Sequence, residues 1–305
     1  MIPAAALAAV PGAVDAGATA LRIEPLPGGL LNRSFRIATA AGVFVLRLNA
    51  DAAQTEALGV DRSAELEAQR LAAAVGLAPT VVAAADDHSF LVTRYVAGER
   101  VAAETIATEA GLRRWGATMT RLRTLRAWQP TGSGGDVTAG PAVAVSASDA
   151  LPALRAGASL IERARRLVLR ARAGARPLAI GELEHALELA ERGWECADAG
   201  RGPRCLVHSD PHPDNVLWVP GEGSLVLVDW EYAHIGHPLQ DPAAWLLACP
   251  ALRGREAQLL RACGLERQAD TAMLAGMLAV YALLERAWRM LVETAAGAHP
   301  GGRAN

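Results

Sequence analysis

The sequence contains no lysine, and all 30 basic residues of the 305-residue chain are arginine. This absence excludes a lysine nucleophile, Schiff-base chemistry on lysine, and the lysine of a standard phosphate-binding loop. The 30 basic and 32 acidic residues nearly cancel, so a net charge of −2 leaves no overall field that attracts nucleic acid or an anionic membrane. We therefore expect neither as a partner.

Cysteine and long apolar runs are also scarce. The four cysteines show no C-x-x-C spacing and no disulfide-rich density, which favours a reducing compartment. No uninterrupted apolar run approaches the about 20 residues of a membrane-spanning helix. The apolar segment 1–14 has no basic region and soon meets proline and glycine, so it predicts an amphipathic helix rather than a signal peptide. These features predict a cytoplasmic protein.

The first ninety-odd residues have the alternating apolar pattern and the turn punctuation of β-strands. Residues 61–75 are good helix formers between an aspartate and Gly76, which are helix start and stop signals. The order is βββαββ, and the predicted strands are residues 21–26, 33–40, 42–49, 80–84 and 89–96.

Beyond residue 98, alanine, leucine and arginine at helical spacing dominate the sequence. The predicted helical segments are residues 101–127, 151–174, 180–199 and 253–294. We expect one domain over residues 1–96 and a second, mainly helical domain over 97–305. Gly, Ser and Pro in residues 129–149 predict a mobile loop, either a lid over a site or an ordinary surface loop.

The strongest chemical signal is His208-Ser209-Asp210, followed by Asn215 and then by Asp229 at the end of an apolar strand. Phosphoryl transfer needs a carboxylate that orients a hydroxyl nucleophile, and an oxygen ligand and a second carboxylate that hold Mg²⁺ on the nucleotide. The spacing predicts Asp210 as the base, and Asn215 and Asp229 as the metal ligands.

The segments HSDPHPDN (208–215) and VDWEY (228–232) resemble those of the aminoglycoside phosphotransferase and choline kinase superfamily, relatives of the protein kinases. The resemblance extends over most of the chain. It implies an α+β, two-lobed protein kinase-like fold whose N-terminal lobe has a five-stranded antiparallel sheet and one helix, and whose C-terminal lobe is mainly helical. It also implies ATP and Mg²⁺ as cofactors and a small-molecule alcohol as acceptor.

The same resemblance implies that Arg47 contacts the α and β phosphates. Aminoglycoside kinases have lysine there, whereas the choline kinase-like branch commonly uses arginine, which supplies charge and a bidentate fork. Val45 shares the strand face of Arg47 and would line the adenine pocket. Glu65 would be the carboxylate partner of Arg47, with Glu67 as the alternative if the register slips.

The turn before residue 33 resembles the GGLxNRS signature of the choline and thiamine kinase-like branch. Gly28 and Gly29 would let backbone amides approach phosphate, and Asn32 belongs to the same nucleotide-binding signature. Tyr95 and Val96 stand where the family's backbone meets adenine. An ordinary turn and ordinary hinge packing remain the alternatives.

The sequence Asp-Trp-Glu-Tyr at 229–232 has the form seen in the choline and thiamine kinase-like branch. This resemblance implies that the acceptor is a cationic or nitrogenous alcohol such as thiamine, choline or ethanolamine. An aromatic wall with a carboxylate suits such a group. The candidates are Glu231, Trp230, Trp245, Tyr281, Glu285 and Trp288, and the last three share one helix face. Core packing is the alternative for the aromatic residues. His208 and Asp241 are expected to have structural roles in the catalytic loop.

Three other functions compete with this hypothesis. His208, Asp210, His212 and Asp214, with two later histidines at 234 and 237, also fit the ligands of a metallohydrolase, but that reading leaves the kinase-like spacings unexplained. A pseudokinase would rest on the arginine at position 47 alone. An aminoglycoside or other antibiotic kinase is the alternative within the enzyme class.

Overall fold

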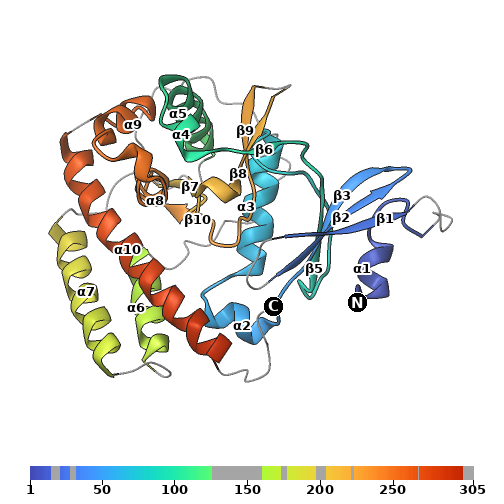
Figure 1. Ribbon diagram of the computed structural model, residues 1–305, viewed down its shortest axis with the longest axis horizontal. Coiled ribbons are helices and arrows are strands. Elements are labelled where there is room, and N and C mark those ends of the chain that lie inside the picture. The colour runs from blue at the N-terminus through green and yellow to red at the C-terminus, as the bar shows by residue number, and fades with distance from the viewer. Residues whose placement is uncertain are drawn as a thin grey trace, which may run out of the picture. The chain divides into compact units, whose positions relative to one another are not determined.

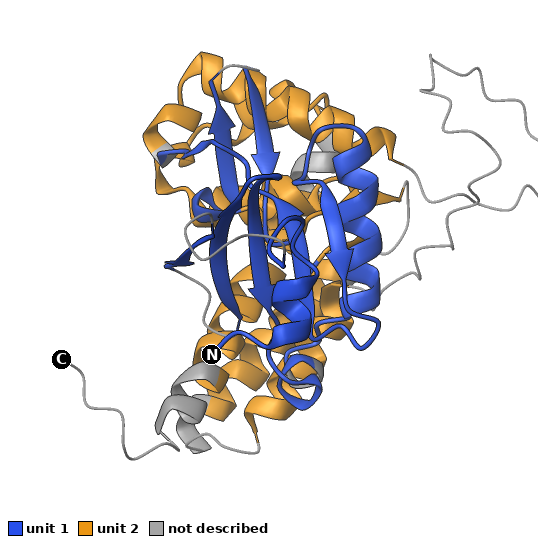
Figure 2. Cartoon of the chain, turned by 90° about the vertical axis from the view of Figure 1, so that its right-hand side faces the viewer, with its two compact units in different colours: residues 1–102, 212–232 blue, residues 103–211, 233–305 orange. Residues whose placement is uncertain are grey.

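The structure is a computed structural model that describes residues 1–14, 21–27, 32–125, 160–172, 177–196, 204–220, 223–266 and 268–297. The predicted site residues Gly28 and Gly29 and the predicted loop 129–149 lie outside the described residues. The chain forms two compact units, residues 1–102 with 212–232 and residues 103–211 with 233–305 (Figure 2). The domain boundary expected after residue 96 stays a prediction.

A five-stranded antiparallel sheet with strand order β1-β2-β3-β5-β4 dominates the first unit (Figure 1). Its strands are β1 Arg22–Leu26, β2 Arg33–Thr39, β3 Gly42–Leu48, β4 Val81–Ala84 and β5 Phe90–Arg94. Each lies within a segment for which the alternating pattern predicted a strand, so the predicted sheet is confirmed.

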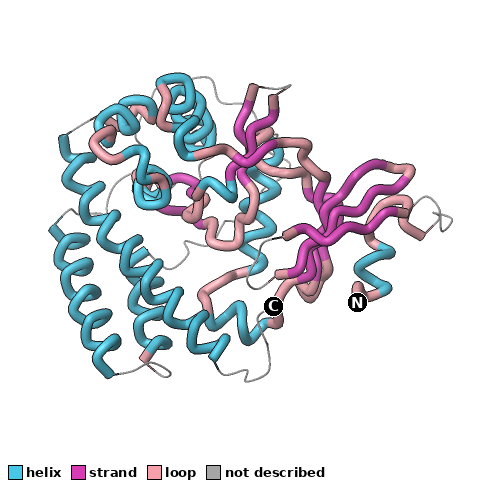
Figure 3. The backbone as a smooth tube through the Cα atoms, viewed as in Figure 1, coloured by secondary structure: helices cyan, strands magenta, loops and turns pink. Residues whose placement is uncertain are grey.

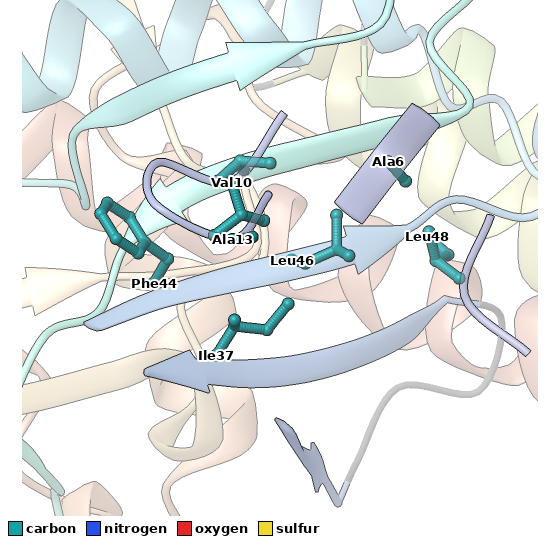
Figure 4. Close-up of a cluster of buried hydrophobic side chains, with 8 residues drawn as sticks. Ala6, Val10, Ala13, Ile37, Phe44, Leu46 and Leu48 are labelled. Carbon is teal, nitrogen blue, oxygen red and sulfur yellow. The ribbon is translucent and has the colours of Figure 1, made fainter. Parts of the chain in front are cut away.

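Strand β3 has one face that packs in the core of this unit and an opposite face that is more polar. Its alternate residues join a buried cluster with the segment that contains α1 Ala4–Ala8, the predicted N-terminal helix (Figure 4). The cluster comprises Ala6, Val10, Ala13, Ile37, Phe44, Leu46, Leu48 and Val92. Because successive side chains of a strand point to opposite faces, Val45 and Arg47 lie on the face of β3 away from this cluster.

Two further helices belong to the first unit. In α3, Arg62–Ala74, the Asp61 side chain accepts hydrogen bonds from two amides of the first turn, and Gly76 follows the last turn with φ +70°. The predicted helix is therefore confirmed together with its start and stop signals. A short helix, α2 Ala52–Ala57, was not predicted, because six residues are too few for a helical period to be recognised.

A second sheet in the first unit is built from residues far apart in the sequence. Strands β6 Glu99–Arg100, β8 Val216–Val219 and β9 Ser224–Leu227 pair in the order β6-β8-β9. The amide of Leu227 donates a hydrogen bond of 2.8 Å to the carbonyl of Leu77, which joins the end of β9 to the segment after α3.

The second unit is mostly helical, as predicted (Figure 3). Its helices are α4 Ala103–Ile106, α5 Glu109–Thr124, α6 Leu160–Ala171, α7 Pro177–Cys196, α8 Gln240–Ala248, α9 Glu256–Ala262 and α10 Gln268–Gly297. The long helix α10 packs against α6, α7 and α8. Strands β7 Cys205–Val207 and β10 His234–Gly236 form a small antiparallel sheet. Among the described helices, none is both long and apolar enough to cross a membrane.

Helix α8 was missed by the sequence analysis. Its segment contains prolines, which usually mark loops, but Pro242 stands in the first turn, where the missing amide hydrogen removes no helical hydrogen bond. With α8 included, the architecture is the expected α+β fold with an antiparallel sheet followed by a mainly helical part.

Helices α5 and α9 meet at Gly116, where an added Cβ would lie 2.0 Å from the carbonyl oxygen of Ala262. We expect Gly116→Ala to lower the free energy of unfolding by about 1–3 kcal/mol through overpacking, although alanine favours helix. Gly181 of α7 is the matched control, because no atom lies within 4 Å of its added Cβ, and Gly181→Ala should raise stability by up to about 1 kcal/mol. Denaturant unfolding measures both; changes of the same sign would contradict this packing.

Candidate active site

In the first unit, Arg47 on the polar face of β3 is held by side chains from other elements. Its Nη2 lies 2.5 Å from Oε1 of Glu65 on α3, and its Nη1 lies 3.5 Å from Oδ1 of Asp229 after β9. Its Nε donates a hydrogen bond of 2.8 Å to Oδ1 of Asn49. Of the two glutamates considered from the sequence, Glu65 and not Glu67 makes the contact with Arg47. The guanidinium is thus fixed in direction.

Burial and nearby charges shift the pKa of Arg47 in opposite directions. Burial alone would lower the pKa of the Arg47 guanidinium, yet the pKa is raised overall. The carboxylates of Glu65, Asp229 and Glu231 supply the negative charge that raises it. Arg47 therefore keeps its positive charge at any physiological pH, which a site for the phosphates of a nucleotide requires.

The two predicted metal ligands lie at neighbouring points of the β8–β9 hairpin. Asn215 ends the 3₁₀ turn Pro213–Asn215 before β8, and its carbonyl accepts a hydrogen bond of 2.9 Å from the amide of Val228 after β9. Asp229 comes next and has φ +64°, a left-handed conformation that costs energy for residues with a side chain, although less for aspartate and asparagine than for most. An amide oxygen and a carboxylate are hard oxygen donors, so this pair fits Mg²⁺.

The remaining nucleotide-site candidates surround the same strand. Val45 is directly opposite Thr93 in the β3–β5 register, and the amide of Tyr95 donates to the carbonyl of Val43 at 3.0 Å. Val45, Tyr95 and Val96 are each half-buried. The structure thus brings these residues together at one end of the β3–β5 pair. The guanidinium of Arg36 lies 5.1 Å from the centre of the Tyr95 ring.

In the second unit, Asp241 in the first turn of α8 fixes the backbone that precedes Asp210. Its carboxylate accepts hydrogen bonds from the amides of His208 and Ser209 at 3.0 and 2.7 Å. Ser209 is held at φ +69°, and the amide of Asp210 donates to Nδ1 of His208 at 3.3 Å. The Asp210 side chain itself is half-buried. Asp241 and His208 thus contact the backbone of this loop, and their expected structural roles stay a prediction.

Polar side chains from two helices also surround this loop. The hydroxyl of Ser209 lies 3.1 Å from that of Tyr281 on α10, and Arg163 on α6 donates from Nη1 to Ser209 Oγ at 3.0 Å. Burial, together with the charges of Asp241 and Asp210, raises the pKa of the Tyr281 phenol well above its ordinary value. Tyr281 is therefore a neutral hydroxyl beside the Asp210 loop. Arg163 is a residue near the site that the sequence analysis did not identify. Arg62 of the first unit, which pairs with Glu65 and Glu231, is another.

Several acceptor-site candidates are placed differently from the prediction. Trp230 and Trp245 have no exposed surface: Trp230 donates its indole hydrogen to the carbonyl of Leu227, and Trp245 stacks on Trp115 at 4.3 Å. An acceptor-binding wall made of these two residues is therefore wrong for this structure, and the core alternative describes them.

The carboxylate candidates for binding a cation also have partners inside the protein. The Glu231 side chain is 10% exposed and forms an ion pair with Arg62 at 3.3 Å, so its charge is already neutralised. On α10, the exposed Glu285 pairs with Arg289, and Trp288 is half-buried. Among these candidates, Tyr281 contacts the Asp210 loop through the hydroxyl of Ser209.

The histidines do not form the metal site of a hydrolase. Among the described residues, no group of three or more His, Cys, Asp or Glu side chains is placed to hold a metal ion. His212 instead accepts a hydrogen bond from the amide of Asp214 at 3.2 Å, and burial lowers the pKa of its imidazole. The metallohydrolase alternative is therefore not supported.

The buried carboxyl of Asp241 predicts a pH dependence of stability. Burial raises its pKa from 3.8 to about 6, and the two amide hydrogen bonds only partly oppose this. For an acid with a raised pKa in the folded state, the stabilisation is present below the unfolded pKa and is lost as pH rises through the folded pKa. We expect the loss to be about 3 kcal/mol between about pH 4 and pH 7.

Asp241→Asn removes this titration while keeping a side-chain oxygen that can accept a hydrogen bond. The difference in unfolding free energy, wild type minus variant, should fall as pH rises, and urea unfolding of both proteins across this range measures it. Parallel curves for the two proteins would show that Asp241 does not titrate in this way.

With this geometry described, known proteins provide a comparison. The model of the phosphotransferase enzyme family matches residues 22–291. A choline/ethanolamine kinase family protein from Mesorhizobium loti is similar at 25% identity and a TM-score of 0.67, with 98% of this chain and 87% of that chain covered. The choline kinase LicA from Streptococcus pneumoniae has 16% identity and a TM-score of 0.66, with coverage of 94% and 88%.

A more distant structure is the aminoglycoside phosphotransferase APH(4)-Ia in a ternary complex with ADP and hygromycin B. It has 18% identity and a TM-score of 0.53, with 92% of this chain and 95% of that chain covered. No curated protein sequence matches the chain. The kinase-like fold of these structures agrees with the fold described above. Because the family match runs from β1 into α10 and includes every candidate residue discussed here, this chain belongs to the phosphotransferase enzyme family.

Proposed function

We propose that the protein transfers the γ-phosphoryl group of Mg²⁺-ATP to a hydroxyl of a small cationic or nitrogenous alcohol. The observation that carries the proposal is the position of Arg47, which contacts Glu65 on one side and Asp229 on the other. A largely buried, permanently charged guanidinium beside a candidate metal ligand is suited to binding the phosphates of a nucleotide.

On the nucleotide side, Arg47 neutralises phosphate charge and Glu65 fixes its direction. Asn215 and Asp229 would hold Mg²⁺, which would supply positive charge to offset that of the phosphates. Val45, Tyr95 and Val96 would contact adenine. Catalysis in this scheme comes mainly from positioning and from stabilisation of charge.

On the acceptor side, Asp210 orients the hydroxyl and accepts its proton. The acceptor oxygen forms a bond to the γ-phosphorus while the bond from that phosphorus to the β–γ bridging oxygen breaks, and ADP leaves. The proton passes from Asp210 to solvent, which restores the carboxylate. Asp241 and His208 support this step by fixing the backbone of the Asp210 loop.

The acceptor class rests on weaker support. The similarity to the Mesorhizobium loti protein, a choline/ethanolamine kinase family protein, supports a nitrogenous alcohol. Tyr281, placed against Ser209, would line the acceptor site with a neutral hydroxyl. The alternative acceptor is an aminoglycoside, since phosphotransferases of that kind are also similar in fold.

The test is coupled ADP release with Mg²⁺-ATP against thiamine, choline, ethanolamine and several aminoglycosides. Release with one nitrogenous alcohol supports the proposal, and release with an aminoglycoside alone supports the alternative. Nucleotide binding without turnover across the panel, measured calorimetrically, would favour a pseudokinase over an enzyme for these acceptors. Absence of any nucleotide binding would overturn the proposal.

A further inference from the structure

Arg62, the first residue of α3, has a buried side chain that contacts three separate parts of the first unit. Its Nη1 lies 2.7 Å from Oε2 of Glu65 and 3.3 Å from Oε2 of Glu231. Its Nη2 donates a hydrogen bond of 2.9 Å to Oδ1 of Asn32, at the start of β2. A planar guanidinium fork can satisfy several acceptors at once in this way, which a lysine ammonium does less well.

Glu231 is held by two partners through one oxygen. Besides the ion pair with Arg62, Oε2 of Glu231 accepts a hydrogen bond of 3.1 Å from Nδ2 of Asn32. Asn32 is itself fixed, because its Oδ1 also accepts from the amide of Ala50 at 3.2 Å. The three side chains Arg62, Asn32 and Glu231 are hereafter called the Glu231 clamp. Asn32 thus has an internal role in addition to the nucleotide-binding role expected from its motif.

One member of the clamp, Glu231, lies two residues after the candidate metal ligand Asp229 in the chain. On the upstream side of Asp229, the amide of Val228 is hydrogen-bonded to the carbonyl of Asn215 at 2.9 Å. On the downstream side, Glu231 is held by the clamp. Asp229, between these two anchors, has the left-handed conformation, which costs energy and persists only where the surroundings enforce it. Anchors at Val228, one residue before Asp229, and at Glu231, two residues after it, restrict the backbone between them.

Ion pairs also connect the clamp to Arg47 and Asp229. Ion pairs link two guanidiniums and three carboxylates, those of Arg47, Arg62, Glu65, Glu231 and Asp229. Arg62 shares its charge between Glu65 and Glu231, so part of the charge of Glu231 is offset beside Asp229. The formal sum of this set is one negative charge, which a divalent cation would more than offset.

We infer that Arg62 is a positioning residue for Asp229: through Glu231 it sets the direction in which Asp229 presents its carboxylate to Mg²⁺. The inference rests on the proposed function, in which Asp229 holds the metal of Mg²⁺-ATP. It assigns Glu231 to the metal side of the reaction and removes it from acceptor recognition. The clamp therefore affects the metal-dependent part of nucleotide binding and leaves the acceptor site unchanged.

The experiment measures ADP affinity calorimetrically with excess Mg²⁺ and with EDTA, for wild type, Arg62→Gln, Glu231→Gln and the double variant. The ratio of the two affinities is the gain that Mg²⁺ provides. Loss of a group that orients a metal ligand typically costs about 10–100-fold in metal affinity, so the gain should fall by that factor in each single variant. ADP affinity in EDTA and the acceptor KM should be unchanged.

The design keeps the inference falsifiable if one variant fails to fold. Arg62→Gln leaves two buried carboxylates with one cation, whereas Glu231→Gln is nearly isosteric and keeps Arg62 paired with Glu65. The double variant should lose no more than the larger single loss, because both changes remove the same ion pair. Arg113→Gln is the control, since Arg113 is exposed and pairs only weakly with Glu109 at 3.7 Å.

The outcomes separate this inference from the proposed function. An unchanged Mg²⁺ gain in Glu231→Gln overturns the inference while wild-type turnover leaves the proposed function standing. Equal losses with Mg²⁺ and with EDTA also overturn it, because the clamp would then shape the whole nucleotide site. Wild-type protein that neither binds ADP nor turns over overturns the proposed function itself, and the inference with it.

Discussion

Replacing Asp210 by alanine is expected to reduce turnover by about 10²–10⁴-fold, the contribution of a positioned general base. The affinity for Mg²⁺-ATP should remain close to that of the wild type, because the residues proposed to bind nucleotide and metal are Arg47, Asn215 and Asp229, and the Asp210 side chain is assigned to the acceptor hydroxyl. The two measurements are coupled ADP release for turnover and calorimetry for nucleotide binding. The expected result is a loss in kcat without a comparable loss in nucleotide affinity.

Asp214 provides a matched control in the same short segment. Its carboxylate is exposed and pairs with Arg100 at 2.9 Å, so Asp214→Ala removes an equal charge without touching the proposed base. Turnover of Asp214→Ala should stay near that of the wild type. Wild-type turnover in Asp210→Ala, or an equal loss in both variants, would remove Asp210 from the role of base.

The second large effect is expected at Glu65, whose side chain is 2% exposed. Its carboxylate pairs with Arg47 through one oxygen and with Arg62 through the other. Glu65→Ala would leave two buried guanidiniums near each other without their shared carboxylate. Breaking a buried ion pair from one side costs about 3–5 kcal/mol of stability. Denaturant unfolding measures this loss, and calorimetry should show weaker nucleotide binding because Arg47 is no longer fixed.

Glu67 on the same helix is the control for this effect. Burial raises the pKa of the Glu67 carboxyl, but Glu65 is the residue that pairs with Arg47. Glu67→Ala should therefore change stability and nucleotide affinity much less than Glu65→Ala. Equal effects of the two substitutions would mean that helix α3 as a whole, and not the Glu65 carboxylate, supports the site.

Local pattern was enough to predict the elements that carry the site. The alternation in β3 fixes which residues enter the core, so Arg47 and Val45 had to share the other face. Asp61 and Gly76 mark the ends of α3, which puts Glu65 in its first turn. The facing of strand residues and the ends of a helix are determined by residues close together in the sequence, so a local pattern is enough to predict them.

Contacts between distant residues were beyond such reasoning. Arg62 and Glu231 are separated by 169 positions, and nothing local marks them as partners. Burial was equally hidden, since a tryptophan after a strand or within a helix has the same pattern whether it packs in the core or lines a site. Trp230 and Trp245 were therefore assigned to the acceptor site, although both are completely buried.

At Asp229, the left-handed backbone conformation and the proposed role as metal ligand place opposite demands on the residue type. Glycine adopts this conformation without cost, whereas a residue with a side chain costs about 1–2 kcal/mol there. Directed evolution for heat resistance alone would therefore favour glycine at position 229 and would eliminate the proposed metal ligand. Engineering of this protein for heat resistance should keep Asp229 fixed and seek its gains elsewhere, for example at Gly181, where space for a side chain is open.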